Sequence, residues 1–268
     1  MNTSDQTTPI VSSLSAIASI LNAIAWPTVV GWFLFSNRRR IALLFKVLIR
    51  KLASAKKLKF GQFEMDQLKD EIEDAVDTAG QQADAPEFPK AVPSNQIEAA
   101  KALKEKIATT SIPSVNIRDT VRREIDKLAR EYDSIRERME SGPVRTRRMN
   151  EIAAGMRTLA LAALSLRTEL TRSSSAGRRL AAICILQVEP RPRYFRWLID
   201  RVKTEKHAFL LYHAALAIVE AAKKGFYINP DEARNLIREA IVSVSSYTGG
   251  PPDQNTLDAL NEALSLMR

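Results

Sequence analysis

Residues 207–224 read HAFLLYHAALAIVEAAKK, and this stretch sets the fold class. It is rich in alanine and leucine, which are strong helix formers, and Gly225 follows it at the position where helices often end. A second run of the same character, MRTLALAALSLRTEL, occupies residues 156–170. Aromatic residues, which favour strands, make up only 6% of the chain. The sequence therefore predicts an all-α protein.

A weak internal repeat lies in the same half of the chain. Residues 179–186 (RLAAICIL) parallel residues 212–219 (YHAALAIV) at an offset of 33 positions. Paired helices at such a period are typical of helical-repeat proteins. Two copies leave two architectures open for residues 117–268, which are a helical bundle and a short HEAT-like helical stack. Alternating apolar and polar residues near 58–64 predict either one short strand or the fraying end of a helix.

The N-terminal region has the composition of a membrane span. No charged residue occurs between Asp5 and Arg38, and crossing a bilayer takes roughly 20 apolar residues. We therefore expect residues 10–36 to form a transmembrane helix. Every basic residue of the first 60 positions follows this span, so residues 1–9 should lie outside and the C-terminus in the cytoplasm of a bacterial inner membrane. The alternative is a buried apolar helix of a soluble domain.

Small and polar residues within the predicted span suggest association between helices. Ser15, Ser19 and Ala23 recur at four-residue spacing, which allows close helix approach. Asn22 places an amide in the span, and Pro27 frees the carbonyl of Ala23. A contact between Asn22 side chains of two copies would satisfy the amide and give a homo-oligomer. The alternative is that Asn22 bonds its own backbone and the small residues meet lipid.

Charge changes sign sharply after the predicted span. Residues 1–60 carry nine basic residues and one acid, whereas residues 61–100 carry two lysines and ten acids. We interpret residues 37–64 as a basic juxtamembrane segment and residues 65–116 as an acidic segment with a flexible linker. The side chains expected to meet lipid headgroups are Arg38, Arg39, Arg40, Lys46, Arg50 and Lys51.

An apolar stripe at heptad spacing follows in residues 118–140. Its members are spaced 4, 3, 4, 3 and 4 positions apart. Such a stripe is typical of a coiled coil or of an amphipathic helix packed on its own domain, and its short length favours the second. The stripe consists of Val121, Ile125, Leu128, Tyr132, Ile135 and Met139.

Arginines crowd the predicted connections between the C-terminal helices. Guanidinium groups bind phosphate and carboxylate well, so these arginines are candidates for binding an anion or a partner. The alternative, which we favour, is that they form a solvated surface with structural ion pairs. Tyr194, Phe195 and Trp197 stand beside three of them and resemble a stacking site. The set is Arg145, Arg147, Arg148, Arg178, Arg179, Arg191, Arg193 and Arg196.

No catalytic, metal or cofactor site is expected. His207 and His213 are six residues apart and fall on different helix faces, and the single cysteine, Cys184, lies in an apolar run. We expect a buried, unreactive thiol and structural histidines. Ser173, Ser174 and Ser175 are expected to cap a helix rather than to supply a nucleophile. No phosphate-binding glycine pattern occurs, so the sequence does not predict an enzyme.

The runs at 141–164 (SGPVRTRRMNEIAAGMRTLALAAL), 174–202 and 205–218 carry a resemblance. They resemble uncharacterised bacterial single-pass membrane proteins whose helical cytoplasmic domain is of the kind joined to predicted signalling or anti-phage effector modules. This resemblance implies a role in sensing, scaffolding or defence.

The leading hypothesis is therefore a membrane-tethered protein-interaction or sensor/scaffold component of a bacterial defence or stress system. Its expected partners are the lipid bilayer and a cytoplasmic protein, and a second copy of the chain is a further candidate. One alternative is a membrane-disrupting effector that assembles through its transmembrane helix. Another is nucleotide or nucleic-acid recognition by the Arg-rich helical domain, which is not favoured.

Overall fold

The computed structural model describes residues 64–83, 91–110, 112–227, 229–246 and 253–267. All regular structure within these ranges is helical, as the composition predicts, and the described residues contain no strand. The predicted transmembrane helix at 10–36 and the basic segment at 37–63 lie outside the described residues. So does the strand predicted near 58–64, except for Glu64, which begins a helix instead. None of the described helices is both long enough and apolar enough to cross a membrane.

The described helices belong to one unit, Gln62–Arg268. The first of them covers residues 64–81. The others are α3 (Ser94–Thr109), α4 (Ser114–Arg138), α5 (Pro143–Thr158), the 3-10 turn η1 (Leu164–Leu166), α6 (Arg167–Thr171), α7 (Ala176–Val188), η2 (Pro192–Tyr194), α8 (Phe195–Thr204), α9 (Ala208–Lys223), α10 (Pro230–Ser245) and α11 (Gln254–Leu266).

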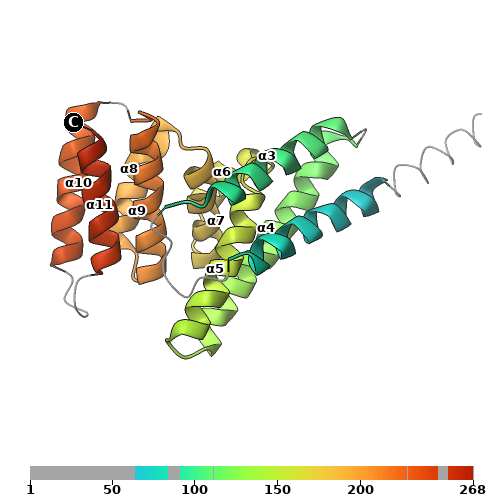
Figure 1. The fold of residues 1–268 in the computed structure, drawn as a ribbon, viewed down its shortest axis with the longest axis horizontal. Helices are drawn as coiled ribbons and strands as arrows, with labels where there is room; N and C mark the ends of the chain where they lie inside the picture. Colours follow the sequence, from blue (N-terminus) through green and yellow to red (C-terminus); the bar gives the residue numbers. More distant parts are fainter. Residues whose placement is uncertain (1–63, 84–90, 111, 228, 247–252, 268) are drawn as a thin grey trace, which may run out of the picture. The chain divides into compact units, whose positions relative to one another are not determined.

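Successive helices pack pairwise along the unit (Figure 1). α5, α7, α9 and α11 contact one another in that order. α6, α8 and α10 pack on α7, α9 and α11 respectively, and α8 also contacts α10. The two copies of the weak repeat fall in α7 and α9, which pack directly against each other. The repeat in the sequence thus reflects helices in equivalent positions.

A close crossing of α4 and α7 fixes the start of this stack. Ser175 caps α7 by accepting a hydrogen bond from the Arg178 amide, as its sequence position suggests. Asp133 of α4 accepts from the Ser175 hydroxyl at 2.7 Å and from the Gly177 amide at 2.8 Å. A Cβ atom on Gly177 would lie 2.1 Å from the carbonyl oxygen of Ala129, so this crossing requires glycine.

The heptad stripe of α4 is buried within its own domain. Val121, Ile125, Leu128 and Tyr132 all belong to the core, and Ile135 packs against it. The stripe is therefore used for packing inside one chain, which confirms the amphipathic-helix alternative.

Much of residues 65–116, interpreted as an acidic segment with a flexible linker, forms helices that pack on the core. Helix 64–81 contributes Leu68, Ile72 and Val76 to the core, and α3 contributes Ala100 and Leu103. The boundary expected at residues 116/117 falls inside α4. In helix 64–81 the acidic residues accompany an apolar stripe of period 3.6, so one face of this helix is buried while the other carries the charge.

Candidate functional site

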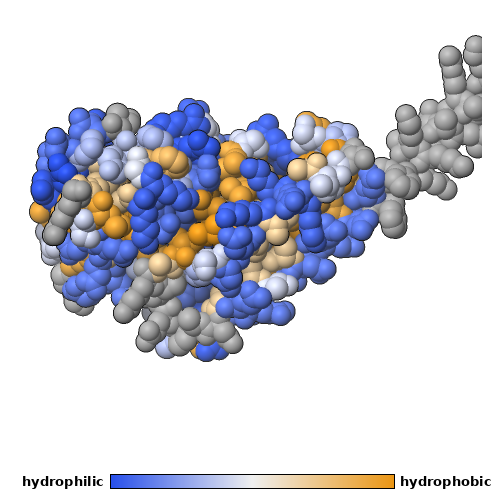
Figure 2. Space-filling model, turned by 45° about the horizontal axis from the view of Figure 1, so that its top comes forward, coloured by the Kyte–Doolittle hydropathy of each residue, from blue (hydrophilic) through white to orange (hydrophobic). Residues whose placement is uncertain are grey.

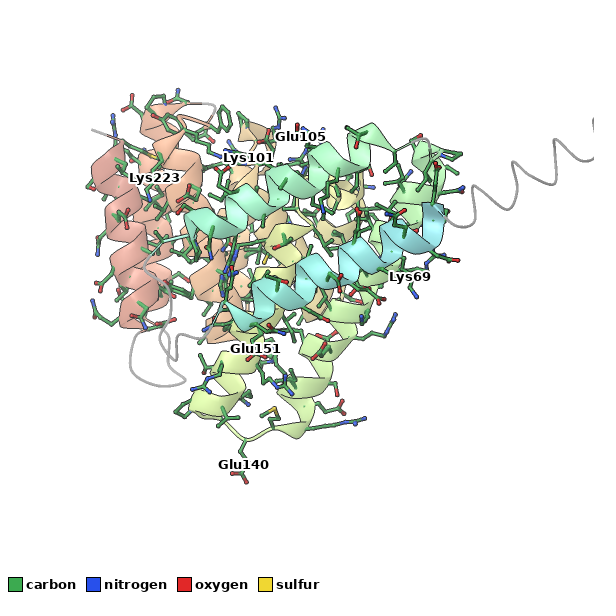
Figure 3. All side chains as sticks on the ribbon, turned by 45° about the vertical axis from the view of Figure 1, so that its right-hand side comes forward. Lys69, Lys101, Glu105, Glu140, Glu151 and Lys223 are labelled. Atoms are coloured by element: carbon green, nitrogen blue, oxygen red, sulfur yellow. The ribbon has the colours of Figure 1, made fainter. Side chains whose placement is uncertain are left out.

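A groove runs between helix 64–81 and α3. The two helices are antiparallel: Asn95, at the start of α3, donates to the Gln82 side chain at 3.3 Å, whereas Glu64 shares a cavity with Thr109. Figure 3 shows both helices on the front of the unit, with Lys101 and Glu105 on the side of α3 away from helix 64–81. The groove consists of two adjoining cavities of about 340 and 250 Å³, which share Glu71 and Lys106.

Small side chains keep the groove open. Ala75, Ala79, Ala99 and Ala102 line the larger cavity, and none of them is long enough to fill the space between the helix axes. Leu103 completes its apolar lining. A methyl group at each of these positions leaves room that a side chain from another helix could occupy.

The charge along the groove is predominantly negative. Helix 64–81 holds seven acidic residues against one lysine. Glu64, Glu71 and Asp74 line the cavities and have no ion-pair partner among the described residues, whereas Lys106 is the single basic residue in their lining. An acidic edge beside an apolar floor favours a cationic, amphipathic occupant.

A polar chain begins at the floor of the groove and passes through the core. Gln96 of α3 lines the larger cavity, is 3% exposed, and accepts a hydrogen bond from Nε of Arg157. Arg157, in α5, donates from Nη1 to Oε1 of Gln187 at 3.1 Å. Gln187, in α7, donates to the His213 carbonyl at 2.8 Å and to its Nδ1 at 3.1 Å. Four helices are thus joined by one buried chain.

Burial sets the protonation state of Arg157 and His213 in this series of hydrogen-bonded side chains. It lowers the pKa of Arg157, which has no carboxylate in contact among the described residues. Burial and the nearby positive charge of Arg157 place the pKa of His213 well below its ordinary value, so the imidazole is neutral. Because Gln187 donates to Nδ1, the imidazole proton lies on Nε2, which has no hydrogen-bond partner among the described residues.

The cysteine and the two histidines, for which we expect no catalytic or metal-binding role, are buried or half-buried in the structure. Cys184 is fully buried, as predicted, and burial raises the pKa of its thiol to about 11, which disfavours the reactive thiolate. His213 is fully buried and His207 is half-buried. Within the described ranges, no three His, Cys, Asp or Glu side chains are grouped so that they could hold a metal ion.

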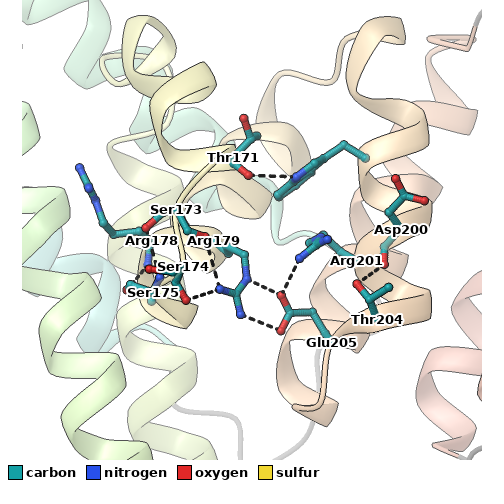
Figure 4. A network of polar contacts seen from close by, with 12 residues as sticks. Thr171, Ser173, Ser174, Ser175, Arg178, Arg179, Asp200, Arg201, Thr204 and Glu205 are labelled. Carbon is teal, nitrogen blue, oxygen red and sulfur yellow. Dashed lines mark hydrogen bonds and ion pairs between the residues drawn. The ribbon is translucent and has the colours of Figure 1, made fainter.

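Two predicted arginines of α7 are held by acidic partners, and Figure 4 shows the pair that one of them, Arg179, forms with Glu205. Arg178 pairs with Asp126 at 3.0 Å and with Glu169 at 2.7 Å. Arg179 forms a two-pronged pair with Glu205, a carboxylate that is only 6% exposed and also contacts Arg201. These two guanidinium groups are structural ion pairs that tie α7 to neighbouring helices.

The remaining predicted arginines are spread over two other places. At the start of α5, Arg145 donates to the Met139 carbonyl at 3.1 Å, Arg148 pairs with Glu151 at 3.2 Å, and Arg147 is exposed. Around η2, Arg191 pairs with Glu189 at 2.7 Å and Arg196 pairs with Glu232. The structure thus does not gather the predicted set into one basic surface.

The predicted aromatic stacking site is not open to a base. Phe195 is 4% exposed and lies in the core, and the Trp197 indole donates to the Thr171 carbonyl at 3.1 Å. Tyr194 is also buried, but two guanidinium groups, those of Arg167 and Arg193, lie against its ring.

Reasoning from sequence missed Arg157, Gln96 and Arg167. The signal for Arg157 is an arginine flanked by the apolar run of residues 152–166, where a solvated guanidinium has no exposed face. Gln96 gives no comparable signal, because glutamine is ordinary on a helix surface.

Comparisons with known proteins give no assignment. No protein-family model matches this chain, no curated protein matches its sequence, and no solved structure matches its fold. The resemblance to bacterial membrane proteins with helical cytoplasmic domains therefore stays a prediction.

Proposed function

We propose that this chain is a membrane-tethered protein-interaction component whose docking site is the groove between helix 64–81 and α3. The occupant is a helix of a partner protein with an apolar face and basic residues beside it. The observation that supports this most directly is the open apolar groove with unpaired acidic residues along its edge. Helix-in-groove binding uses this combination of an apolar floor and a complementary charged rim.

The lining of the groove fits a helical occupant. The residues facing it from helix 64–81 include Glu64, Leu68, Glu71, Ala75 and Thr78, spaced three or four apart along one face. The alanines on both helices allow apolar side chains of a third helix to enter. On the face shown in Figure 2, apolar surface shows as an uneven band between hydrophilic stretches.

The membrane tether in this proposal rests on the sequence. The uncharged stretch at 10–36, followed by Arg38, Arg39 and Arg40, predicts a single span with the helical unit on the cytoplasmic side. A scaffold or sensor of a bacterial defence or stress system is the role that this placement and the predicted resemblance support. The small-residue face with Asn22 supports association of spans, and with it the alternative of a membrane-disrupting effector.

Nucleic-acid recognition receives less support than protein binding. Arg148, Arg178, Arg179, Arg191 and Arg196 are each engaged by a carboxylate, which leaves fewer free cations for phosphates. A stacked helical arrangement of the kind found in helical-repeat proteins suits protein partners better, because successive helix pairs present an extended surface.

A matched pair of synthetic peptides tests the chemistry of the groove. Both would be 18-residue amphipathic helices with the same leucine face, one flanked by lysines and the other by glutamates. We expect the lysine peptide to bind the full chain at least tenfold more tightly than the glutamate peptide, and its affinity to fall as salt is raised. Equal affinity for the two peptides, or no binding of either, would refute the proposed partner chemistry.

A further inference from the structure

A second site of a different kind surrounds Tyr194. The guanidinium carbons of Arg167 and Arg193 lie 5.1 and 4.6 Å from the centroid of its ring. Arg193 also donates from Nη2 to the Tyr194 hydroxyl at 2.8 Å. Arg167 is the first residue of α6, whereas Arg193 belongs to η2, so two separate elements bring the cations together.

Positive charge exceeds negative charge at this place. Arg191 pairs with Glu189 at 2.7 Å, so this carboxylate is already engaged. Arg167 and Arg193 have no ion-pair partner among the described residues. Burial lowers the pKa of Arg167, and although Tyr194 raises it, the charges of Arg193 and Arg191 lower it further. Two guanidinium groups against one ring repel each other, and an anion that contacts both would offset this repulsion.

Two hydrogen-bond donors beside Tyr194, Nε of Arg167 and the Thr168 hydroxyl, are available to a ligand. Arg167 is 8% exposed, and its buried Nε has no hydrogen-bond acceptor in the part of the chain that the structure describes. The Tyr194 hydroxyl lies 2.8 Å from the Thr168 hydroxyl. Because the phenol oxygen accepts from Arg193, it can give its own proton to Thr168, which frees the Thr168 proton for another acceptor.

Capping of a helix end accounts for only part of this arrangement. Arg167 donates to the Glu189 carbonyl at 3.2 Å, and Lys224 donates to the Val188 carbonyl at 2.9 Å, so both cations satisfy the C-terminus of α7. The second guanidinium, Arg193, takes no part in this cap and contacts Tyr194 instead. Capping also leaves the Nε donor of Arg167 without an acceptor among the described residues.

We propose that Arg167, Thr168, Arg193 and Tyr194 form a binding site for a phosphate group, either free phosphate or the phosphomonoester headgroup of a lipid. Arginine forks donate to phosphate oxygens in pairs and tolerate stacking on an aromatic ring. Arg193 is exposed and can donate to the ligand directly, whereas Arg167 is buried and contributes its positive charge. This site is independent of the groove and of its proposed partner.

Titration calorimetry on the full chain in neutral detergent tests the site, with inorganic phosphate as the probe and sodium chloride holding the ionic strength constant. We expect saturable binding that weakens about tenfold or more in Arg193→Gln, which removes a charge-assisted donor. Arg172→Gln is the matched control, because Arg172 is exposed, carries the same charge and lies close by in the chain. Its affinity for phosphate should equal that of the unmodified chain.

Three outcomes decide the proposal. Loss of binding in Arg193→Gln but not in Arg172→Gln supports the site. Equal losses in both variants, or no saturable phosphate binding, would overturn it. Competition by phosphatidic acid, but not by phosphatidylcholine, in mixed micelles assigns the phosphate to a lipid headgroup, whereas no competition by either assigns it to the free ion.

Discussion

Arg157 donates from Nη1 to Oε1 of Gln187 across 3.1 Å in the centre of the helical unit, where both residues are at most 2% exposed. The guanidinium is held by neutral amide oxygens, from Gln187 and Gln96, and no carboxylate contacts it among the described residues. Such a chain demands that α3, α5, α7 and α9 keep one register, because a shift of any helix leaves a buried polar group unsatisfied.

Replacing Arg157 should be costly. Arg157→Ala leaves a cavity and deprives two buried amide oxygens of their donor, so we expect the free energy of unfolding to fall by about 3 kcal/mol. Chemical denaturation of the full chain measures this loss. Arg147→Ala, at an exposed arginine on the surface of α5, should change stability by less than about 0.5 kcal/mol. Similar effects of the two changes would contradict a structural role for the buried hydrogen bonds of Arg157.

His213 should make stability depend on pH. Its pKa in the folded state lies well below the ordinary value of 6.5, so the unfolded chain binds the proton more readily. Stability is therefore complete above pH 6.5 and falls as the pH drops below it, by up to about 1.4 kcal/mol per pH unit. In His213→Gln this decline should be shallower, and midpoints of denaturation between pH 7.5 and 5 would show it. An unchanged slope would indicate that other groups control it. His207 is one such group, because burial also lowers its pKa, and His207→Gln measures its share.

Gly177 should tolerate no side chain. Because its Cβ would lie 2.1 Å from the Ala129 carbonyl oxygen, Gly177→Ala has to push α7 away from α4. We expect the free energy of unfolding to drop by about 3 kcal/mol. Gly142→Ala is the control, since nothing lies within 4 Å of a Cβ at that position. If both variants unfold at the same denaturant concentration, the close crossing is not as described.

Most helices of residues 118–267 could be predicted because their signals are local. The run at 156–170 is an exception: the sequence predicts a continuous helix there, but α5 ends at Thr158 and the chain continues through η1 into the short α6. Ser175 and Asn229 cap helices, Pro192 and Pro230 open them, and Gly225 follows the end of one. The start of the described unit gives a weaker signal, because acidic residues and nearby prolines accompany the stripe of Leu68, Ile72 and Val76.

The groove and the buried series of hydrogen-bonded side chains could not be predicted from the sequence, and the reason lies in the tertiary packing. Each depends on which faces of distant helices meet, as when Gln96 reaches Arg157 across 61 positions of sequence. The same holds for the arginines, because Asp126, Glu169 and Glu205 neutralise Arg178 and Arg179 only once α4, α6 and α8 are in place. Sequence gives the residue types, but the pairing is a property of the tertiary packing.

The predicted tether is tested by membrane fractionation. After carbonate extraction, the full chain should remain in the membrane pellet, whereas a chain that begins at residue 60 should be released. Reporters at residues 5 and 268 should lie on opposite sides of the membrane. A full chain that is released by carbonate would show that residues 10–36 do not span the bilayer.

The most direct test of the central claim is the affinity of the lysine-flanked amphipathic peptide for a chain whose groove is filled. Ala102 is exposed and lines the larger cavity, so Ala102→Trp should occupy the space for the partner without disturbing the core. Val242→Trp is the control, because Val242 is 66% exposed on α10 and away from the groove lining. We predict at least a tenfold loss of affinity in Ala102→Trp and none in Val242→Trp, by fluorescence anisotropy. Equal affinity of both variants and the unmodified chain would show that the groove is not the docking site.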